Sequence, residues 1–333
     1  VYIDQALNVV YPADVRQDGP LDVFMAHMDV VFSDETELPL RVEDGRIYCP
    51  GVGDDTACLV CLLMAGKYIA RHVDSPRWRE IRGEDAPGLL LVCNAGEEGL
   101  GNLKGVRKIC EDYGGRIKSF CTFDSSLSSI VDRAVGSKRF RVKVRTRGGH
   151  SYNDFGNDNA IAGLASLVGN LYKIQVPEGG KTTYNVGMIS GGTSVNTIAQ
   201  EAGMLYEFRS DKRENLEYME RQFTEVLDRA KAEGMDVSFQ VIGVRPCEGQ
   251  VDPAQKQALT DWAHRVVEEM TGQAPKHHAG STDCNIPLSL GIPSVCVGSF
   301  RGAGAHTREE YVETDSLEEG YKVAFGMIFG RRD

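Results

Sequence analysis

The sequence predicts an α/β protein. Its main domain has a mostly parallel sheet sandwiched by helices, and an α+β domain is inserted into this main domain. Two patterns of apolar and charged residues along the 333-residue chain lead to this prediction. From residue 1 to about residue 135, strand-like runs that are apolar throughout alternate with helical stretches, which is typical of parallel strands buried on both faces. From residue 137 to about residue 246, charged and apolar residues alternate along the strands, which indicates a sheet with one solvent-exposed face. After residue 246 the pattern of the first region returns, so the second domain is expected to be an insertion into the first.

The first domain is expected to comprise residues 1–135 and 247–333. Its strand-like runs cover residues 21–26, 88–93, 120–123 and 292–298. The stretch TACLVCLLMAGKYIARH at 56–72 predicts a helix that Asp55 or Thr56 caps. Residues 71–88 carry charges, proline and glycine and are predicted to form a surface loop. Another helix is expected around residues 254–271.

The inserted domain is expected to span residues 136–246. Its pattern reads strand (KRFRVKVRTR), helix (NAIAGLASLVGNLYKI), two strands (TTYNVGMIS and GMLYEFRS), helix (NLEYMERQFTEVLDRAKAEG) and strand (VSFQVIGV). This βαββαβ order is that of the ferredoxin-like fold.

Composition excludes several classes of protein. The formal net charge of −11 argues against a nucleic-acid-binding surface, which requires a basic stripe. No run of about 18 apolar residues is present, so no membrane span is expected. The nine cysteines are odd in number and lie mostly within apolar runs, and no secretory apolar region opens the chain, so we predict a reduced, cytoplasmic protein. Because the chain starts with a strand-like VYID and no initiator Met, we also expect an upstream segment to be missing.

Acidic residues and histidines stand just after these strand-like runs or at the start of a helix. They are His27, Asp29, Asp54, Glu97, Glu98, Asp124 and His306. This placement can bring five carboxylates and two imidazoles together at one edge of a single sheet. So many acids would repel each other strongly unless cations lay between them. The pattern therefore predicts a two-metal hydrolase.

Two of the motifs are weak when taken alone. In AHMDV, His27 can offer a ring nitrogen to a metal while Asp29 hydrogen-bonds the other ring nitrogen and fixes the tautomer. A buried histidine of no special role fits that motif equally well. In GVGDDTA, the better interpretation of Asp54 and Asp55 alone is a helix-capping pair. The functional interpretation has one aspartate bridging two cations while its neighbour caps the helix.

The motif NAGEEGLGNLKG is harder to explain structurally, because Glu97 and Glu98 follow a fully apolar strand. Adjacent side chains point in different directions, so one carboxylate can bind a metal while the other acts as general base. Its glycines do not predict phosphate binding, since no Walker lysine and threonine follow. Asp124 and His306 are not decisive alone, and Cys58 and Cys61 within an apolar helix predict core packing.

The order, spacing and strand-end placement of these residues together resemble the dizinc peptidase and amidohydrolase family that contains peptidase T, glutamate carboxypeptidase, aminoacylase and succinyl-diaminopimelate desuccinylase. The resemblance extends over nearly the whole chain. It implies that His27, Asp54 and Asp124 hold one zinc. It also implies that Asp54, Glu98 and His306 hold the other, so that Asp54 is the bridge. Glu97 then resembles the general base of the family, and Asp29 its histidine-orienting acid.

The inserted domain resembles the lid of the same family. GGHSYNDFGNDNAI resembles the segment whose histidine, here His150, stabilises the oxyanion, often from a partner subunit. GGTSVNTIA and LYEFRS resemble the lid strands whose Asn and Arg, here Asn196 and Arg209, grip the substrate. The resemblance also implies a homodimer formed through this domain. Asp124, SYNDFGNDNAI and GSTDCNIPLSLGIP favour the peptidase T branch.

The expected activity is therefore hydrolysis of peptide bonds in short peptides by an aminopeptidase. The resemblance implies a hydroxide shared by two zinc ions, for which cobalt or manganese could substitute, and Glu97 as the base. An N-acyl-amino-acid deacylase or a carboxypeptidase of the same family remains the alternative. A non-catalytic binding module is the contrasting class, but such proteins usually lose metal ligands that this sequence retains.

Overall fold

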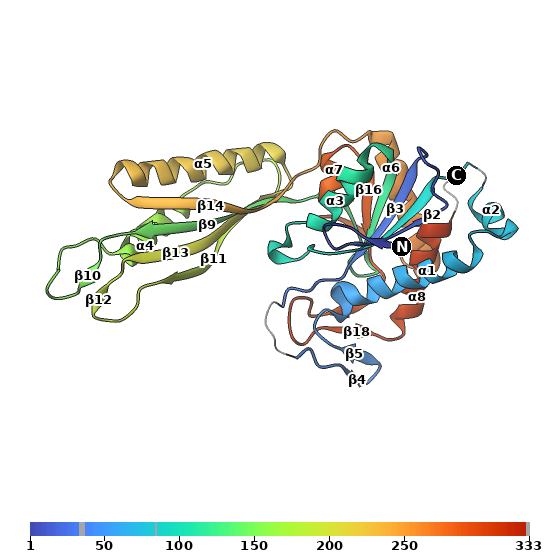
Figure 1. Cartoon of the computed structure of the whole chain (residues 1–333), viewed down its shortest axis with the longest axis horizontal. Helices are drawn as coiled ribbons and strands as arrows, with labels where there is room; N and C mark the ends of the chain where they lie inside the picture. The colour runs from blue at the N-terminus through green and yellow to red at the C-terminus, as the bar shows by residue number, and fades with distance from the viewer. Residues whose placement is uncertain (33–36, 84, 331–333) are drawn as a thin grey trace. The chain divides into compact units, whose positions relative to one another are not determined.

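The structure, a computed structural model, describes residues 1–32, 37–83 and 85–330 and divides into two compact units (Figure 1). The larger unit comprises Val1–Ala134 and Glu248–Asp333, and the inserted unit comprises Val135–Cys247.

The larger unit is built on one eight-stranded sheet with the order β1-β2-β6-β3-β7-β16-β8-β15. At its centre, β6 (Gly88–Asn94), β3 (Leu21–His27), β7 (Ile117–Phe123) and β16 (Ser294–Val297) are mutually parallel. Antiparallel pairs join β2 to β6 and β16 to β8, so the sheet is mixed toward its edges. The predicted α/β class with a mostly parallel sheet is confirmed.

Helices cover both faces of this sheet. Along β3, Phe24 and Ala26 pack into one apolar cluster, whereas Val23 and Met25 pack into the other, because successive side chains of a strand point to opposite faces. The first cluster includes residues of α1 (Cys58–His72), α6 (Pro253–Thr271) and α8 (Ser316–Phe329). The second includes residues of α3 (Lys104–Tyr113) and α7 (Asn285–Ser289).

The remaining strands of the larger unit lie outside this central group or in a second sheet. In the main sheet they are β1 (Tyr2–Ile3), β2 (Val9–Ala13), β8 (Ser129–Ala134) and β15 (Lys276–Gly280). A second sheet has the order β17-β18-β5-β4 and comprises Gly302–Ala303, Tyr311–Glu313, Arg46–Tyr48 and Arg41–Glu43.

Two local predictions were wrong. The helix expected at 56–72 begins at Cys58, after the π-helical turn η1 (Val52–Ala57), and no side chain caps it. Asp55 instead accepts the backbone N–H of His27. The loop expected at 71–88 contains α2 (Pro76–Arg82), which buries Trp78. Ser75 accepts the Trp78 N–H, and a Pro at the first helical position suits a helix start.

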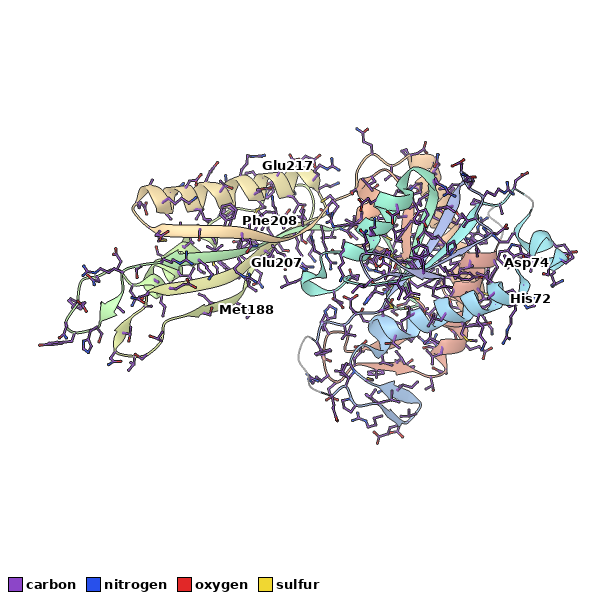
Figure 2. All side chains as sticks on the ribbon, viewed as in Figure 1. His72, Asp74, Met188, Glu207, Phe208 and Glu217 are labelled. Atoms are coloured by element: carbon purple, nitrogen blue, oxygen red, sulfur yellow. The ribbon has the colours of Figure 1, made fainter. Side chains whose placement is uncertain are left out.

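The inserted unit has the ferredoxin-like arrangement that the sequence predicted. Its sheet order is β11-β13-β9-β14 with antiparallel pairs throughout, formed by Thr182–Gly191, Glu201–Ser210, Gly136–Arg145 and Asp236–Arg245. Helices α4 (Ala160–Leu171) and α5 (Arg213–Ala232) pack on one face. Phe208 of β13 lies in that core, whereas its neighbour Glu207 pairs with arginines (Figure 2). A separate pair, β10 (Gly149–His150) and β12 (Thr197–Ile198), carries His150.

The nine cysteines all lie within the described ranges, and each is a free thiol. Cys58 and Cys61 are buried in α1, as core packing predicts. Among the helices of the described chain, none combines the length and apolarity needed to cross a bilayer.

Candidate functional site

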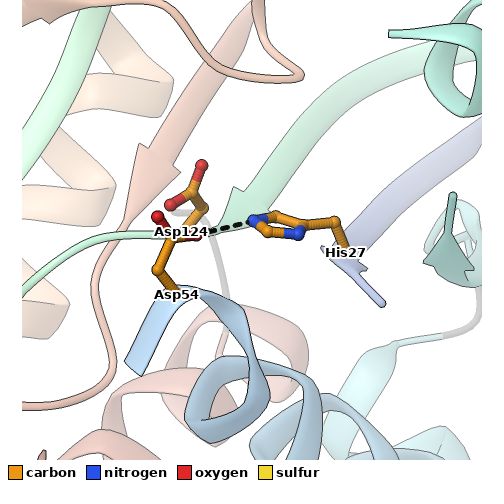
Figure 3. A group of neighbouring side chains, drawn as sticks. All are labelled: His27, Asp54 and Asp124. Carbon is orange, nitrogen blue, oxygen red and sulfur yellow. Dashed lines mark hydrogen bonds and ion pairs between the residues drawn. The ribbon is translucent and has the colours of Figure 1, made fainter. Parts of the chain in front are cut away.

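The predicted acids and imidazoles of the larger unit gather where the central strands end. His27 is the last residue of β3, and Asp124 directly follows β7. Glu97 and Glu98 lie just beyond the end of β6. The chain turns between this strand and the two glutamates at Gly96, whose φ is 79°. Asp54 comes from the turn η1 that precedes α1. The side chains of His27, Asp54 and Asp124 face one another (Figure 3).

Asp54 lies between two imidazoles and contacts one with each of its carboxylate oxygens. Its Oδ1 is 2.9 Å from Nε2 of His27, and its Oδ2 is 3.0 Å from Nε2 of His306. The same His306 nitrogen lies 3.1 Å from Oε1 of Glu98. A carboxylate placed in this way could present one oxygen to each of two cations.

Two groups of three residues share Asp54 and could each hold a metal ion. They are His27 with Asp54 and Asp124, and Asp54 with Glu98 and His306. In each group, one ligand atom per residue lies within 4.8 Å of the others. His27, Glu97 and Glu98 form a third such group, which overlaps the first two. Imidazole nitrogen and carboxylate oxygen are donors that zinc accepts.

The electrostatics of this cluster favour a cation. Burial, followed by the charges of Asp54 and Glu97, raises the pKa of Glu98 to about 7. Burial also raises the pKa of Asp124 to about 7, and the negative charge of Asp54 adds to this rise. The desolvation of His27 lowers its pKa, but nearby acids, Asp55 first, raise it well above its usual value. Carboxylates this close together repel one another when all are ionised, and a cation bound between them stabilises the ionised forms. The donor set therefore fits divalent metal ions.

The prediction that the Asp29 carboxylate orients His27 was wrong. The backbone carbonyl of Asp29, at 2.9 Å, is the partner of His27 Nδ1, whereas the carboxylate lies 3.9 Å away. That carboxylate accepts the backbone N–H groups of Gly96, Glu97 and Glu98 at 2.8, 3.2 and 2.9 Å. Asp29 therefore shapes the turn that carries the two glutamates, and its main chain orients the imidazole.

Two buried acids near the site were missed by the sequence analysis. The Glu310 carboxylate accepts N–H groups from the turn that carries Asp54. Asp283 accepts a hydrogen bond of 2.7 Å from Nδ2 of Asn94, and burial, followed by the charge of Glu97, raises its pKa to about 8. Glu310 immediately precedes the strand-like YVE, so an acid at a strand start was the available signal.

The three predicted lid residues belong to the inserted unit. His150 and Asn196 are exposed, and Nδ1 of His150 accepts the backbone N–H of Tyr152 at 3.3 Å. The Arg209 guanidinium makes two contacts with the Glu207 carboxylate, Nε–Oε1 at 2.9 Å and an Nη2 contact to Oε2 at 3.2 Å.

Comparison with known proteins places this chain in a family. Residues 23–329 match the family model described as peptidase family M20/M25/M40. This chain belongs to that family. Enzymes of the M20 family are metal-dependent hydrolases that bind divalent ions, typically two zinc ions.

Individual relatives are distant but cover most of the chain. The succinyl-diaminopimelate desuccinylase of Nitrosomonas eutropha is 24% identical over 322 residues, which are 90% of this chain and 80% of the relative. The crystal structure of the aminopeptidase PepT from Bacillus cereus is 22% identical, with a TM-score of 0.68 over 97% of this chain and 83% of that one. A tripeptidase structure from Staphylococcus aureus is also 22% identical, with a TM-score of 0.73 over 98% and 87%. At these identities the structural likeness shows a shared fold.

Proposed function

We propose that this M20 hydrolase is a two-metal aminopeptidase that cleaves short peptides, with zinc as the native metal and cobalt or manganese able to replace it. The observation that carries the proposal is the position of Asp54, whose two oxygens face His27 and His306 within two overlapping ligand groups. One group would comprise His27, Asp54 and Asp124, and the other Asp54, Glu98 and His306.

Glu97 is proposed as the general base. Two divalent ions, when bound, lower the pKa of water toward about 7 and polarise a carbonyl. The Glu97 side chain is buried beside Glu98, and its backbone is fixed by the Asp29 carboxylate. A carboxylate held in this way can take a proton from the attacking water and return it to the leaving amine.

His150 is proposed to stabilise the oxyanion. Its Nδ1 accepts backbone N–H groups from Tyr152 and Asn153, so in the neutral ring the proton resides on Nε2. An exposed Nε2–H is a donor suited to a developing negative charge on oxygen.

Arg209 and Asn196 are proposed to hold the free carboxylate of the peptide. The guanidinium is planar and matches a carboxylate bidentately, a geometry that lysine does not reproduce. Its contacts with Glu207 fix the orientation of the group. We also propose, on the family resemblance, a cytoplasmic homodimer formed through the inserted unit.

A deacylase acting on N-acyl amino acids is the second candidate, because the relative from Nitrosomonas eutropha is a desuccinylase. It would use the same metal-binding residues and base, and it would require a blocked amine where the aminopeptidase requires a free one.

A panel of free, N-acetylated and C-terminally amidated di- and tripeptides tests the proposal. Release of the first residue from free tripeptides, with N-acetylated peptides left intact, is the expected result. Turnover of N-acetylated substrates alone would overturn the aminopeptidase proposal in favour of the deacylase.

A further inference from the structure

Glu310 is a buried acid that the proposed chemistry does not use. Its side chain is 2% exposed. Oε2 accepts the backbone N–H of Gly51 at 2.6 Å, and Oε1 accepts those of Gly53 and Asp54 at 2.9 and 2.8 Å. All three donors belong to the turn that carries Asp54, and hydrogen bonds to an ionised acceptor are the stronger kind.

The Glu310 carboxylate fits closely against the backbone of this turn. Gly51 has a φ of 78°, a conformation that favours glycine. A Cβ on Gly53 would lie 3.0 Å from Oε1 of Glu310 and 2.6 Å from the ring of Phe300. The carboxylate therefore approaches the backbone where only glycine leaves room, and it brings three N–H groups to one point.

The segment that carries Glu310 also carries an imidazole of the site. His306 lies four residues earlier, and its φ of 65° is unusual for a residue other than glycine. Nε2 of His306 is 3.0 Å from Oδ2 of Asp54. The carbonyl of Glu310 accepts the Cys49 N–H at 3.1 Å, which ties this segment to the chain just before the turn.

The Asp29 carboxylate accepts backbone N–H groups of the turn that bears Glu97 and Glu98, as the Glu310 carboxylate does for the turn that bears Asp54. Asp29 follows His27 by two residues, and its carboxylate accepts the N–H groups of Gly96, Glu97 and Glu98. Each histidine-bearing segment of the site thus supplies a carboxylate that holds a turn bearing acidic side chains.

We propose that Glu310 is a positioning residue, which fixes the Asp54 carboxylate between His27 and His306 before metal binds. This inference rests on the metal centre proposed above. Replacing Glu310 with Gln preserves the size of the side chain but leaves one oxygen acceptor, and it turns an NH₂ group toward backbone N–H donors. Asp54 then loses its fixed position, and metal affinity falls.

The test compares Glu310→Gln with Glu309→Gln, a matched loss of one charge at the exposed neighbouring position. Affinity for Co²⁺ and Zn²⁺ is measured by competition with a chromophoric chelator, which needs no substrate. We expect affinity to fall by about 10- to 100-fold in Glu310→Gln, the usual effect of losing a group that orients a metal ligand. Glu309→Gln should bind both metals as the wild type does.

Hydrogen exchange separates positioning from general destabilisation. In Glu310→Gln, the amides of Gly51, Gly53 and Asp54 should exchange faster, while the amides of β6 keep their protection. The d–d spectrum of the Co²⁺ form should also change in this variant alone. Wild-type metal affinity and unchanged exchange in Glu310→Gln would overturn the proposal.

A measurement on the wild type decides the matter should Glu310→Gln fail to fold. In the metal-free wild-type protein, the amides of Gly51, Gly53 and Asp54 should already be protected from exchange. Free exchange of these amides without metal would overturn the proposal. Because these readouts use no peptide, failure of the aminopeptidase proposal would appear separately, in the substrate panel.

Discussion

Metal binding should release protons, because acids of the site bind protons when the metals are absent. The metal-free protein is titrated with Co²⁺ at pH 6 and at pH 8. Glu98 and Asp124 both have pKa values raised to about 7, from 4.5 and 3.8. Both must be ionised to bind metal.

The expected proton count follows from these pKa values. With a pKa near 7, each carboxyl is roughly 90% protonated at pH 6 and roughly 10% protonated at pH 8. The pair should therefore release close to two protons per chain at pH 6 and about 0.2 at pH 8. The pKa of His27 is raised well above its usual value by nearby acids, so its imidazolium adds to the release at both pH values. Each proposed metal group contains one of these two acids. Because protons compete with metal for them, the affinity of each site should be at least about tenfold weaker at pH 6 than at pH 8, and the product of the two binding constants at least about 100-fold smaller.

Isothermal titration calorimetry in buffers of different ionisation enthalpy measures this count. The apparent binding enthalpy should depend more steeply on the buffer at pH 6 than at pH 8. A buffer-independent enthalpy at pH 6, together with an affinity that does not change with pH, would show that Glu98 and Asp124 are already ionised in the metal-free protein.

The remaining predictions concern single residues. Glu97→Gln should keep both metals but lower kcat by more than the roughly 10²- to 10⁴-fold of simple acid–base catalysis, because Glu97 also positions the nucleophile. Glu98→Ala should lose one metal, and equal metal loss in both variants, measured by mass spectrometry of the bound ions, would show that their roles are wrongly assigned. Arg209→Lys should lower kcat/KM by about tenfold or more, the scale of a lost charge-assisted hydrogen bond. Amidated peptides should show a similar loss with the wild type and little further loss with Arg209→Lys, and equal rates for free and amidated tripeptides would contradict this.

The sequence could predict where the acids gather, because the carboxyl ends of parallel strands meet at one edge of a sheet. His27 and Asp124 end or follow such strands, and both lie in the cluster. The ferredoxin-like order of the inserted unit was likewise readable from the alternation of strand and helix patterns.

Long-range hydrogen bonds were beyond sequence reasoning. The spacing of Asp29 from His27 suggested a local contact, but the N–H groups that its carboxylate accepts lie 67 to 69 residues away. The partners of Glu310 are 256 to 259 residues away, and no local pattern encodes them. Asp55 does not cap α1 for the same reason, since its carboxylate instead accepts the backbone N–H of His27, at the end of β3. By contrast, Ser75–Pro76 was a local signal for the start of α2, which the prediction of a loop at 71–88 did not use.

The metal content of the protein is the most direct test of the two-metal site. Protein purified without chelator and analysed by mass spectrometry of its ions should contain close to two divalent metals per chain. Stripping them should abolish peptide hydrolysis, and zinc, cobalt or manganese should restore it. A content near zero that none of these three ions can restore would contradict the two-metal account.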